Sequence, residues 1–336
     1  MKTTIRHYTL YILHFALALA FAPCANASAL PFLIIADWGA RPGSAGAAVQ
    51  RKVATQIGRT AAEINSRFVL TLGDNFQHIG KEPVRPDNPL WKKFFEDVYT
   101  APSLQTPWYP ALGNHDYDHM DNPQSQIDYS KHSKRWRLPE RYYTWTETVD
   151  PDTTVQFFIL DSTPFVESRF RGPERPRPDW RAQLAWFERE LAASKARWKI
   201  VAAHFPIYSA GVLVVGQLAY RDVTTMQNFI QPLLEKHGVQ VYLSGHFHNF
   251  QHLKDGGPVD YFIVGSGFLK VPAGPKHRFS EFIQGDTAGF SAVIVKRDTM
   301  EIRFVDEDGK VFYKTEVEAE KRVNPSNVTK PKHNES

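Results

Sequence analysis

The stretch FVLTLGDN, residues 68–75, passes from the pattern of a buried strand directly into glycine and a carboxylate. Its apolar run over residues 68–72 is typical of a strand that is covered on both faces of its sheet. Gly73 lets the backbone turn sharply after such a strand, which leaves Asp74 at the carboxyl end. Because ligands gather at the carboxyl ends of strands in open α/β sheets, this stretch predicts a layered α/β fold with a site at that edge.

Four other apolar segments end in the same way, in side chains that can bind a metal. They are residues 32–36 before Asp37, residues 108–112 before Asn114 and His115, residues 199–203 before His204, and residues 239–244 before His246 and His248. Aspartate, asparagine and histidine supply ligands that suit iron, zinc or manganese. Two cations held about 3.5–4 Å apart need a bridging carboxylate, and Asp74 is the natural bridge. A structural zinc site at the last two histidines is the alternative, but the surrounding carboxylates favour an open, catalytic site.

The rest of the chain alternates short apolar runs with amphipathic stretches, which favours one layered α/β domain over residues 28–317. Further strands are expected at residues 155–160, 261–264, 290–295, 301–305 and 311–317, with a hairpin turn at residues 306–309. Helices are expected at residues 47–64, 90–99, 180–193 and 224–236. The final stretch, residues 318–336, is polar and is expected to be a disordered tail.

The first 27 residues have the pattern of a cleaved secretory signal. Lys2 and Arg6 precede an apolar stretch over residues 8–22, and small residues follow it. The apolar core is shorter than the ~20 residues of a membrane span, which argues against the alternative of a membrane anchor. Cys24 is the only cysteine and leaves with the signal. A secreted chain without a disulfide fits a bacterial periplasm better than a eukaryotic secretory route.

The charge balance argues against a nucleic-acid-binding surface. The chain has 40 basic and 36 acidic residues, a net charge of +4, which is too small an excess for such a surface. Recognition of any anionic partner is therefore expected from a local site. The protein is expected to be a monomer without a stable membrane anchor. Residues 164–178 hold four arginines among four prolines and form either a solvated loop or a lid that attracts anions.

Taken in order, the strand-end motifs resemble the pattern of the calcineurin-like metallophosphoesterases. The motifs are Asp37-x-Gly39, Gly73-Asp74, Gly113-Asn114-His115-Asp116, Val201-x-x-His204 and Gly245-His246-x-His248. Within that superfamily the chain is most similar to the small, mammalian-type purple acid phosphatases, a likeness that residues 107–109, 125–131 and 134–136 support. The resemblance covers residues 33–268 and implies a four-layer αββα sandwich, in which helices flank two mixed β-sheets.

The resemblance also implies a role for each candidate site residue. It assigns Asp37, Asp74 and His248 to a first metal, and Asp74, Asn114, His204 and His246 to a second. His115 would donate a proton to the leaving group or bind the phosphate, and Asn75 and Asn249 would help to orient the site. The implied cofactors are two metal ions, iron together with zinc, manganese or a second iron.

Two departures from the family pattern bear on these metals. Gln77 stands where the family has a tyrosine whose phenolate binds the first metal and gives the purple colour. Either the amide oxygen of Gln77 or the neighbouring His78 could coordinate there. Neither is anionic, so we expect a colourless protein with a divalent or weakly bound metal in its first site. Residues 212–214 are apolar where relatives often have a second histidine, so more depends on His115.

Together with the resemblance, these residues predict an exported dinuclear-metal phosphatase with small-molecule phosphate esters as partners. It is expected to hydrolyse phosphomonoesters, as an acid phosphatase does, by in-line attack of a metal-bound hydroxide. One alternative is a phosphodiesterase or nucleotidase on the same metal frame, which depends on the loops that form the pocket walls. The other is a degenerate protein that binds phosphate or metal without turnover. Gln77 and the absent second histidine are the features that favour this last alternative.

Overall fold

The computed structural model describes residues 28–77, 84–166, 177–210 and 224–319. The expected signal peptide, His78, residues 212–214, most of the arginine-rich loop and nearly all of the expected tail therefore lie outside the described residues. Strand β13 extends to Glu318, one residue beyond the domain boundary expected from the sequence.

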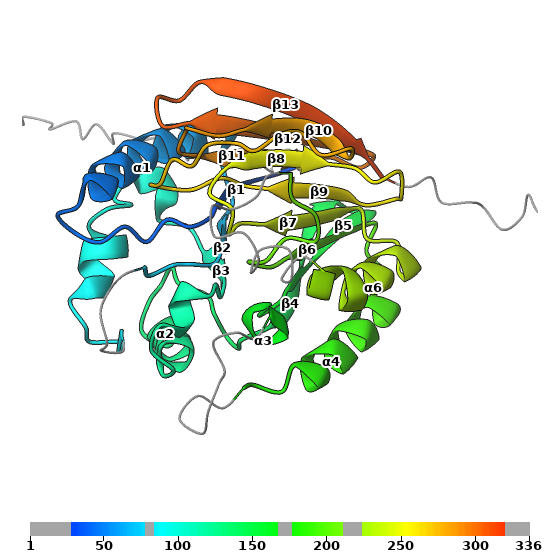
Figure 1. The fold of residues 1–336 in the computed structure, drawn as a ribbon, viewed down its shortest axis with the longest axis horizontal. Helices are drawn as coiled ribbons and strands as arrows, with labels where there is room; N and C mark the ends of the chain where they lie inside the picture. Colours follow the sequence, from blue (N-terminus) through cyan, green and yellow to red (C-terminus); the bar gives the residue numbers. More distant parts are fainter. Residues whose placement is uncertain (1–27, 78–83, 167–176, 211–223, 320–336) are drawn as a thin grey trace, which may run out of the picture.

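Two β-sheets form the centre of the molecule (Figure 1). The first sheet has the strand order β13 (Val311–Glu318), β12 (Thr299–Asp306), β11 (Gly289–Val295), β1 (Leu30–Ile35), β2 (Val69–Leu72) and β3 (Trp108–Ala111). The second has the order β10 (Ser280–Gln284), β8 (Phe250–Leu253), β9 (Asp260–Ile263), β7 (Val241–Ser244), β6 (Trp198–Ala202), β5 (Thr153–Ile159) and β4 (Tyr143–Asp150).

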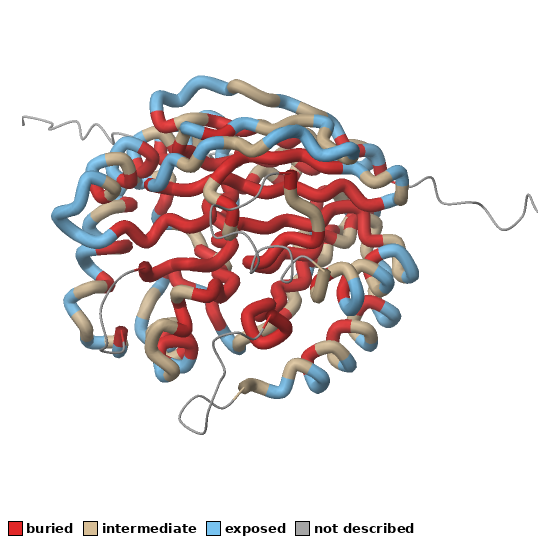
Figure 2. The backbone as a smooth tube through the Cα atoms, viewed as in Figure 1, coloured by how far each residue is buried: buried red, intermediate tan, exposed pale blue. Residues whose placement is uncertain are grey.

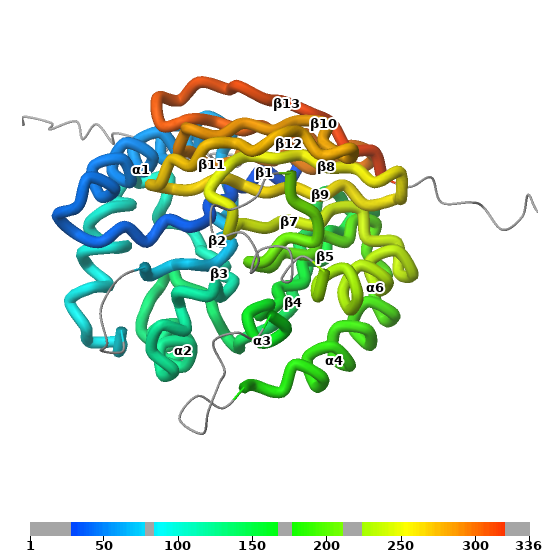
Figure 3. Tube along the Cα trace, viewed as in Figure 1, coloured from blue at the N-terminus to red at the C-terminus, as the bar shows by residue number. Residues whose placement is uncertain are grey.

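Both sheets are mixed, as expected from the sequence. Strands β1, β2 and β3 are parallel, while β11 pairs antiparallel with β1, β12 with β11 and β13 with β12. In the second sheet, β5, β6, β7 and β9 are parallel, while β4 pairs antiparallel with β5, β8 with β9 and β10 with β8. The trace in Figure 3 shows the N-terminal β1 lying beside the late strand β11. Strands from the beginning and from the end of the domain are therefore neighbours in one sheet.

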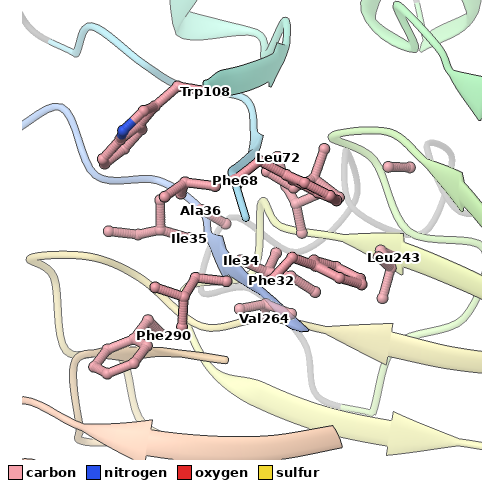
Figure 4. Packing of buried hydrophobic residues seen from close by; sticks show 14 of the residues in the cluster. Phe32, Ile34, Ile35, Ala36, Phe68, Leu72, Trp108, Leu243, Val264 and Phe290 are labelled. Carbon is pink, nitrogen blue, oxygen red and sulfur yellow. The ribbon is translucent and has the colours of Figure 1, made fainter. Parts of the chain in front are cut away.

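The core lies between the sheets and on their outer faces. Phe32 of β1 meets Phe157 of β5 edge to face, with ring centroids 5.4 Å apart, and Phe32 and Ile34 lie beside Leu243 and Val264 (Figure 4). Successive strand residues face opposite sides, so the next residue of β5, Phe158, points outward and packs against Phe187. Figure 2 shows the strands buried at the centre and the exposed residues at the periphery.

Helices cover the outer faces. Helix α1 (Ala45–Ile64) lies on one side of the paired sheets, and α4 (Trp180–Ala193) and α6 (Gln231–Lys236) lie on the opposite side (Figure 1). Helix α1 begins after Ser44, whose hydroxyl accepts the N–H of Ala47, and ends at Asn65 in the left-handed conformation; both are common caps. The order of helix, sheet, sheet and helix confirms the four-layer sandwich. Shorter helices are α2 (Asn122–Ser130) and α3 (Thr163–Val166).

Two helix predictions need correction. Residues 90–99 do not form one α-helix: the segment contains a short π-helix, η1 (Lys92–Glu96), in which the N–H of Asp97 reaches back to the carbonyl of Lys92. The helix expected over residues 224–236 is interrupted at Ile230. Pro232 follows two residues later; a proline lacks the N–H that a continuous helix needs, and its ring clashes with the preceding turn, so a new helix begins at Gln231.

Candidate metal centre

The segments that follow β1, β2, β3, β6 and β7 meet where the two sheets face each other. The N–H of Asp37, after β1, donates to the carbonyl of Gly73, after β2, at 3.1 Å. The N–H of His115, after β3, donates to Oδ1 of Asp74 at 2.7 Å. Nδ1 of His204, after β6, lies 2.9 Å from the carbonyl oxygen of Leu72. Residues at the carboxyl ends of strands from both sheets thus lie close together, as expected for a ligand site in an α/β fold.

A first group of donors consists of Asp37, Asp74 and His248. One ligand atom of each lies within 4.8 Å of the others, and Nε2 of His248 is 3.3 Å from Oδ1 of Asp37. Both carboxylates are buried, and Oδ1 of Asp37 has no hydrogen-bond partner among the described residues. A buried carboxylate oxygen without a partner is costly in the absence of a cation, so this donor set fits a metal ion.

The electrostatics of His248 also favour a metal ion at this group. Burial by itself lowers the pKa of the His248 imidazole, but the negative charges of Asp37 and Asp74 outweigh burial and raise that pKa above its ordinary value. A cation between these groups would take over the role that the proton has in the metal-free protein, because metal ligands must be deprotonated. Metal binding at this group is therefore expected to release protons.

A second group of donors surrounds Nε2 of His204. This atom is 3.0 Å from Oδ1 of Asn114, 3.2 Å from Nδ1 of His246 and 3.5 Å from Oδ1 of Asp74. Ligands that each lie about 2.0–2.2 Å from one zinc ion are about 3.3–3.6 Å apart in a tetrahedron. The contact of His204 Nδ1 with the Leu72 carbonyl places the ring proton on Nδ1 and the lone pair on Nε2. Donor atoms of Asn114, His246 and Asp74 thus gather around Nε2 of His204, and Asp74 belongs to both groups.

Backbone conformation is unusual at four of these residues. Asp37, Asp74, His246 and His248 have φ angles of 49°, 51°, 73° and 54°. Only two other non-glycine residues in the described ranges have positive φ, Asn65 and Asp286. The left-handed region costs about 1–3 kcal/mol per residue and is concentrated at functional sites. The turn after each strand is thus bent so that the side chain points into the centre.

Two glycines allow the turns to come close together. A Cβ at Gly113 would lie 2.3 Å from both N and Oδ1 of Asp74. A Cβ at Gly245 would lie 2.7 Å from Oδ2 of Asp37 and 2.8 Å from Cβ of Ala36. Each motif glycine therefore makes room for a carboxylate that belongs to a different strand end.

Of the other predicted site residues, His115 is at the centre and Asn75 is beneath it. The side chain of His115 is 23% exposed, and its charge acts on His248. Asn75 is fully buried: its amide donates to the Ala111 carbonyl at 2.8 Å, and its oxygen accepts from Trp38 and Thr71. Asn75 thus braces three segments below the site.

Asn249 and Gln77 are both buried. Oδ1 of Asn249, just before β8, accepts a hydrogen bond from Gln251 of β8 at 2.7 Å. Gln77 donates its backbone N–H to the carbonyl of Gly39 at 3.1 Å, and its amide Nε2 has no hydrogen-bond partner among the described residues. Gln77 therefore lies beside the turn that carries Asp37, with an amide whose hydrogen-bonding capacity is not fully used.

Three supporting residues have no role assigned by the sequence. Asp116 accepts the N–H of Gly113 at 2.8 Å and those of Asn75 and Phe76, which ties two strand ends together. Burial, with a further contribution from Asp74, raises the pKa of Asp116 to about 7. Ser162 accepts the N–H of His204 at 3.2 Å, and Asp118 contacts His115. The position of Asp116 inside the motif was the one available signal.

The family-model match and the curated relatives point to one family. The calcineurin-like phosphoesterase family matches residues 30–250. Tartrate-resistant acid phosphatase type 5 of Oryctolagus cuniculus is 33% identical, over 91% of this chain and 96% of its own. Purple acid phosphatase 4 of Arabidopsis thaliana is 30% identical, over 85% of this chain and 82% of its own. The solved structure of GAP50, described as the anchor in the inner membrane complex of Plasmodium, has a TM-score of 0.72 at 23% identity and covers 89% of this chain and 92% of that one.

The likeness to GAP50, at that identity, concerns the fold alone. The acid phosphatases are alike in sequence as well, and across almost the whole chain. The strand-end motifs and the two adjoining donor groups lie within the matched region. This chain therefore belongs to the calcineurin-like phosphoesterase family, in the group of the purple acid phosphatases.

Proposed function

We propose that this protein is an exported acid phosphatase that uses two metal ions to hydrolyse small phosphomonoesters by in-line attack of hydroxide. The observation that carries the proposal is the pair of donor groups that share Asp74. A shared carboxylate between two nitrogen- and oxygen-rich groups is the arrangement that a two-metal hydrolase needs. The named acid phosphatases among the relatives support the monoester reaction.

The first group, Asp37, Asp74 and His248, would hold one ion, and the second group around His204 would hold the other. Ions bound there would act as Lewis acids and lower the pKa of water from 15.7 to about 7. Iron, zinc and manganese all suit these ligand types. With Gln77 in place of a phenolate, the first group carries less negative charge, which favours a divalent ion over Fe(III).

His115 would act on the substrate itself. Its backbone N–H donates to Oδ1 of Asp74, and its side chain is partly exposed. From there an imidazolium can donate a proton to the leaving oxygen or bind a phosphoryl oxygen. Since hydroxide is the nucleophile, no phosphoenzyme should accumulate, and phosphate should not be transferred to an added alcohol.

Export is proposed from the first 27 residues, with the bacterial periplasm as destination. Within the described residues, no helix combines the length and the apolar character that a membrane span requires. Fractionation of a bacterial host that expresses the chain with and without residues 1–27 tests this. Recovery of the full-length chain in the cytoplasm, still uncleaved, would contradict export. We also propose a monomer that binds no nucleic acid.

The decisive experiment removes and restores the metals. Residues 28–336 are expressed, stripped with a chelator and assayed for phosphate release from an aryl phosphomonoester between acid and mildly alkaline pH. Iron, zinc and manganese are added back singly and in pairs. We expect metal-dependent turnover that Asp74→Ala abolishes. Asp308→Ala is the matched control, because that carboxylate lies on an exposed hairpin and its loss should leave turnover unchanged.

A matched phosphodiester, assayed beside the monoester, decides between the two enzymatic alternatives. Faster turnover of the diester would replace the monoesterase by a phosphodiesterase or nucleotidase on the same frame. No turnover of either ester under any metal loading, with metal still bound, would favour the degenerate binding protein.

A further inference from the structure

His115 and Asp118 form a close pair at the partly exposed side of the metal centre. Nδ1 of His115 lies 2.9 Å from Oδ2 of Asp118. The two side chains are 23% and 24% exposed, so the pair is at the boundary between the buried donor groups and solvent. None of the motifs predicted from the sequence includes Asp118.

The local backbone explains why these two residues meet. Residues His115–Tyr117 form a 3₁₀-helix, η3, and the N–H of Asp118 donates to the carbonyl of His115 at 3.0 Å. A 3₁₀-helix has three residues per turn, so side chains at positions i and i+3 are eclipsed. An α-helical turn would offset them. The tight turn therefore places the carboxylate directly against the imidazole.

The geometry gives the two ring nitrogens of His115 different roles. A carboxylate only accepts hydrogen bonds, so Nδ1 of His115 must be the donor whether the ring is neutral or charged. Proton donation to the substrate then falls to Nε2. The backbone N–H of His115 is held in turn by Oδ1 of Asp74, at 2.7 Å. The residue is thus fixed at its main chain by the metal-bridging carboxylate and at its ring by Asp118.

We propose that Asp118 is a positioning residue that accepts a hydrogen bond from Nδ1–H of His115 and so holds the ring in place. In that orientation the imidazolium gives its Nε2 proton to the leaving oxygen and is left as the neutral Nδ1–H tautomer. This rests on the phosphatase function proposed above. It also chooses between the two roles open to His115. A ring aimed at the leaving oxygen speeds the esters that need protonation, whereas a ring that only binds phosphate would serve all esters equally.

The kinetic test compares two phosphomonoesters with different leaving groups. An alkyl phosphate needs protonation of its leaving oxygen, whereas a nitrophenyl phosphate does not, because nitrophenolate leaves as an anion. We expect Asp118→Asn to lower kcat on the alkyl ester about 10- to 100-fold, part of the 10²–10⁴-fold that a general acid contributes, and to change kcat on the nitrophenyl ester less than about threefold. Equal losses on both esters, or a rise in KM alone, would overturn the proposal.

Asp121→Asn is the matched control, since it removes the same charge from the same segment. Asp121 is 68% exposed and lies 3.9 Å from a different histidine, His119. It should leave both rates unchanged. Thermal unfolding of each variant shows whether the fold is intact. If Asp121→Asn reproduced the selective loss, a general charge effect rather than the contact with His115 would be responsible, and the proposal would fail.

A spectroscopic test is independent of turnover. In zinc-loaded protein labelled with ¹⁵N-histidine, the His115 signals are those that disappear in His115→Gln. We expect wild type and Asp121→Asn to show the Nδ1–H form, and Asp118→Asn to show a mixture. A mixture already in the wild type would overturn the proposal. Absence of wild-type turnover on both esters would contradict the proposed function, whereas turnover with an unselective loss in Asp118→Asn would contradict only the role of Asp118.

Discussion

His246 donates its backbone N–H to Oδ2 of Asp37 at 2.9 Å, across 209 residues of sequence. Asp37 follows β1 of the first sheet, and His246 follows β7 of the second. The hydrogen bond orients the carboxylate so that Oδ1 faces His248. The two donor groups therefore exist only when the sheets are packed together, and the absence of a side chain at Gly245 lets these two strand ends come this close.

Substitution Gly245→Ala should disconnect the two sheets at the metal centre. The new Cβ would lie 2.7 Å from Oδ2 of Asp37, closer than non-bonded atoms approach, and the neighbouring atoms belong to buried strand ends. We expect bound metal to fall at least tenfold, as measured by elemental analysis after dialysis, with a matching loss of activity. Disturbance of residues that orient ligands commonly costs about 10- to 100-fold in affinity. Wild-type metal content in this variant would contradict the geometry.

Substitution Gln77→Tyr should give the iron-loaded protein a colour that the wild type lacks. Gln77 is buried beside the turn that carries Asp37, at the position where the family has its coordinating phenolate. We expect no strong visible charge-transfer band in iron-loaded wild type and a new one in the variant, recorded by absorption spectroscopy. Gln77→Phe, which adds the ring without the hydroxyl, is the control and should stay colourless. A strong band in wild type would contradict the expected divalent site.

Stability should depend on pH through Asp161. Burial raises the pKa of this carboxyl to about 7, against the lowering effects of Tyr117 and Arg141. A raised folded-state pKa means that its contribution is fully present below the unfolded pKa of about 4 and is lost as pH rises to about 7. Relative to Asp161→Asn, which does not titrate, metal-free wild type should therefore lose free energy of unfolding between these two pH values, by up to about 1.4 kcal/mol for each pH unit.

Urea unfolding of both proteins between pH 4 and 8 measures this difference. The Tyr117 hydroxyl donates to the Asp161 carboxylate, so Tyr117→Phe serves as a second comparison that keeps the carboxyl. A difference between wild type and Asp161→Asn that stays constant with pH would show that Asp161 is not perturbed.

The pair formed by Arg135 and Glu96 should stabilise the fold on the side of η1. Arg135 is 6% exposed at its side chain, donates to the carbonyl of Tyr99 at 2.7 Å and lies 4.2 Å above the Phe95 ring. Arg135→Gln should cost about 2 kcal/mol in urea unfolding, because it removes a buried, charged donor from the carbonyl of Tyr99 and from the half-buried Glu96. Arg67→Gln removes a more exposed pair, Arg67–Glu147, and should cost less than about 1 kcal/mol. Equal costs would contradict this ranking.

The fold was predictable where burial is apolar and continuous. Strands such as β2 and β6 and the whole of α4 follow from their apolar patterns. Strand β8 was missed because it is short and carries Gln251 and His252, both buried. These side chains are satisfied by distant groups, the N–H of Ala210 and the carboxylate of Asp260, and no local pattern reveals such partners. Edge strand β4 was not predicted, because many of its residues are polar and only partly buried.

The candidate site was predictable where its metal-binding side chains directly follow a strand. The resemblance named the donors that the structure brings together. It could not find Asp118, whose importance comes from a 3₁₀ turn rather than a motif. Nor could it show that Asn75 braces the floor of the site instead of facing substrate, since its partners Trp38 and Ala111 are 37 and 36 residues away in sequence.

The left-handed backbone of Asp37, Asp74, His246 and His248 has an evolutionary consequence. Glycine adopts this conformation without strain, so a lineage that no longer needed metals could replace any of the four by glycine and gain stability. Most proteins sit only a little above the stability threshold that selection requires, which makes such replacements easy to accept. A chain that keeps two aspartates and two histidines at these strained positions resists that drift, as expected of a lineage still selected for chemistry and not for its scaffold alone.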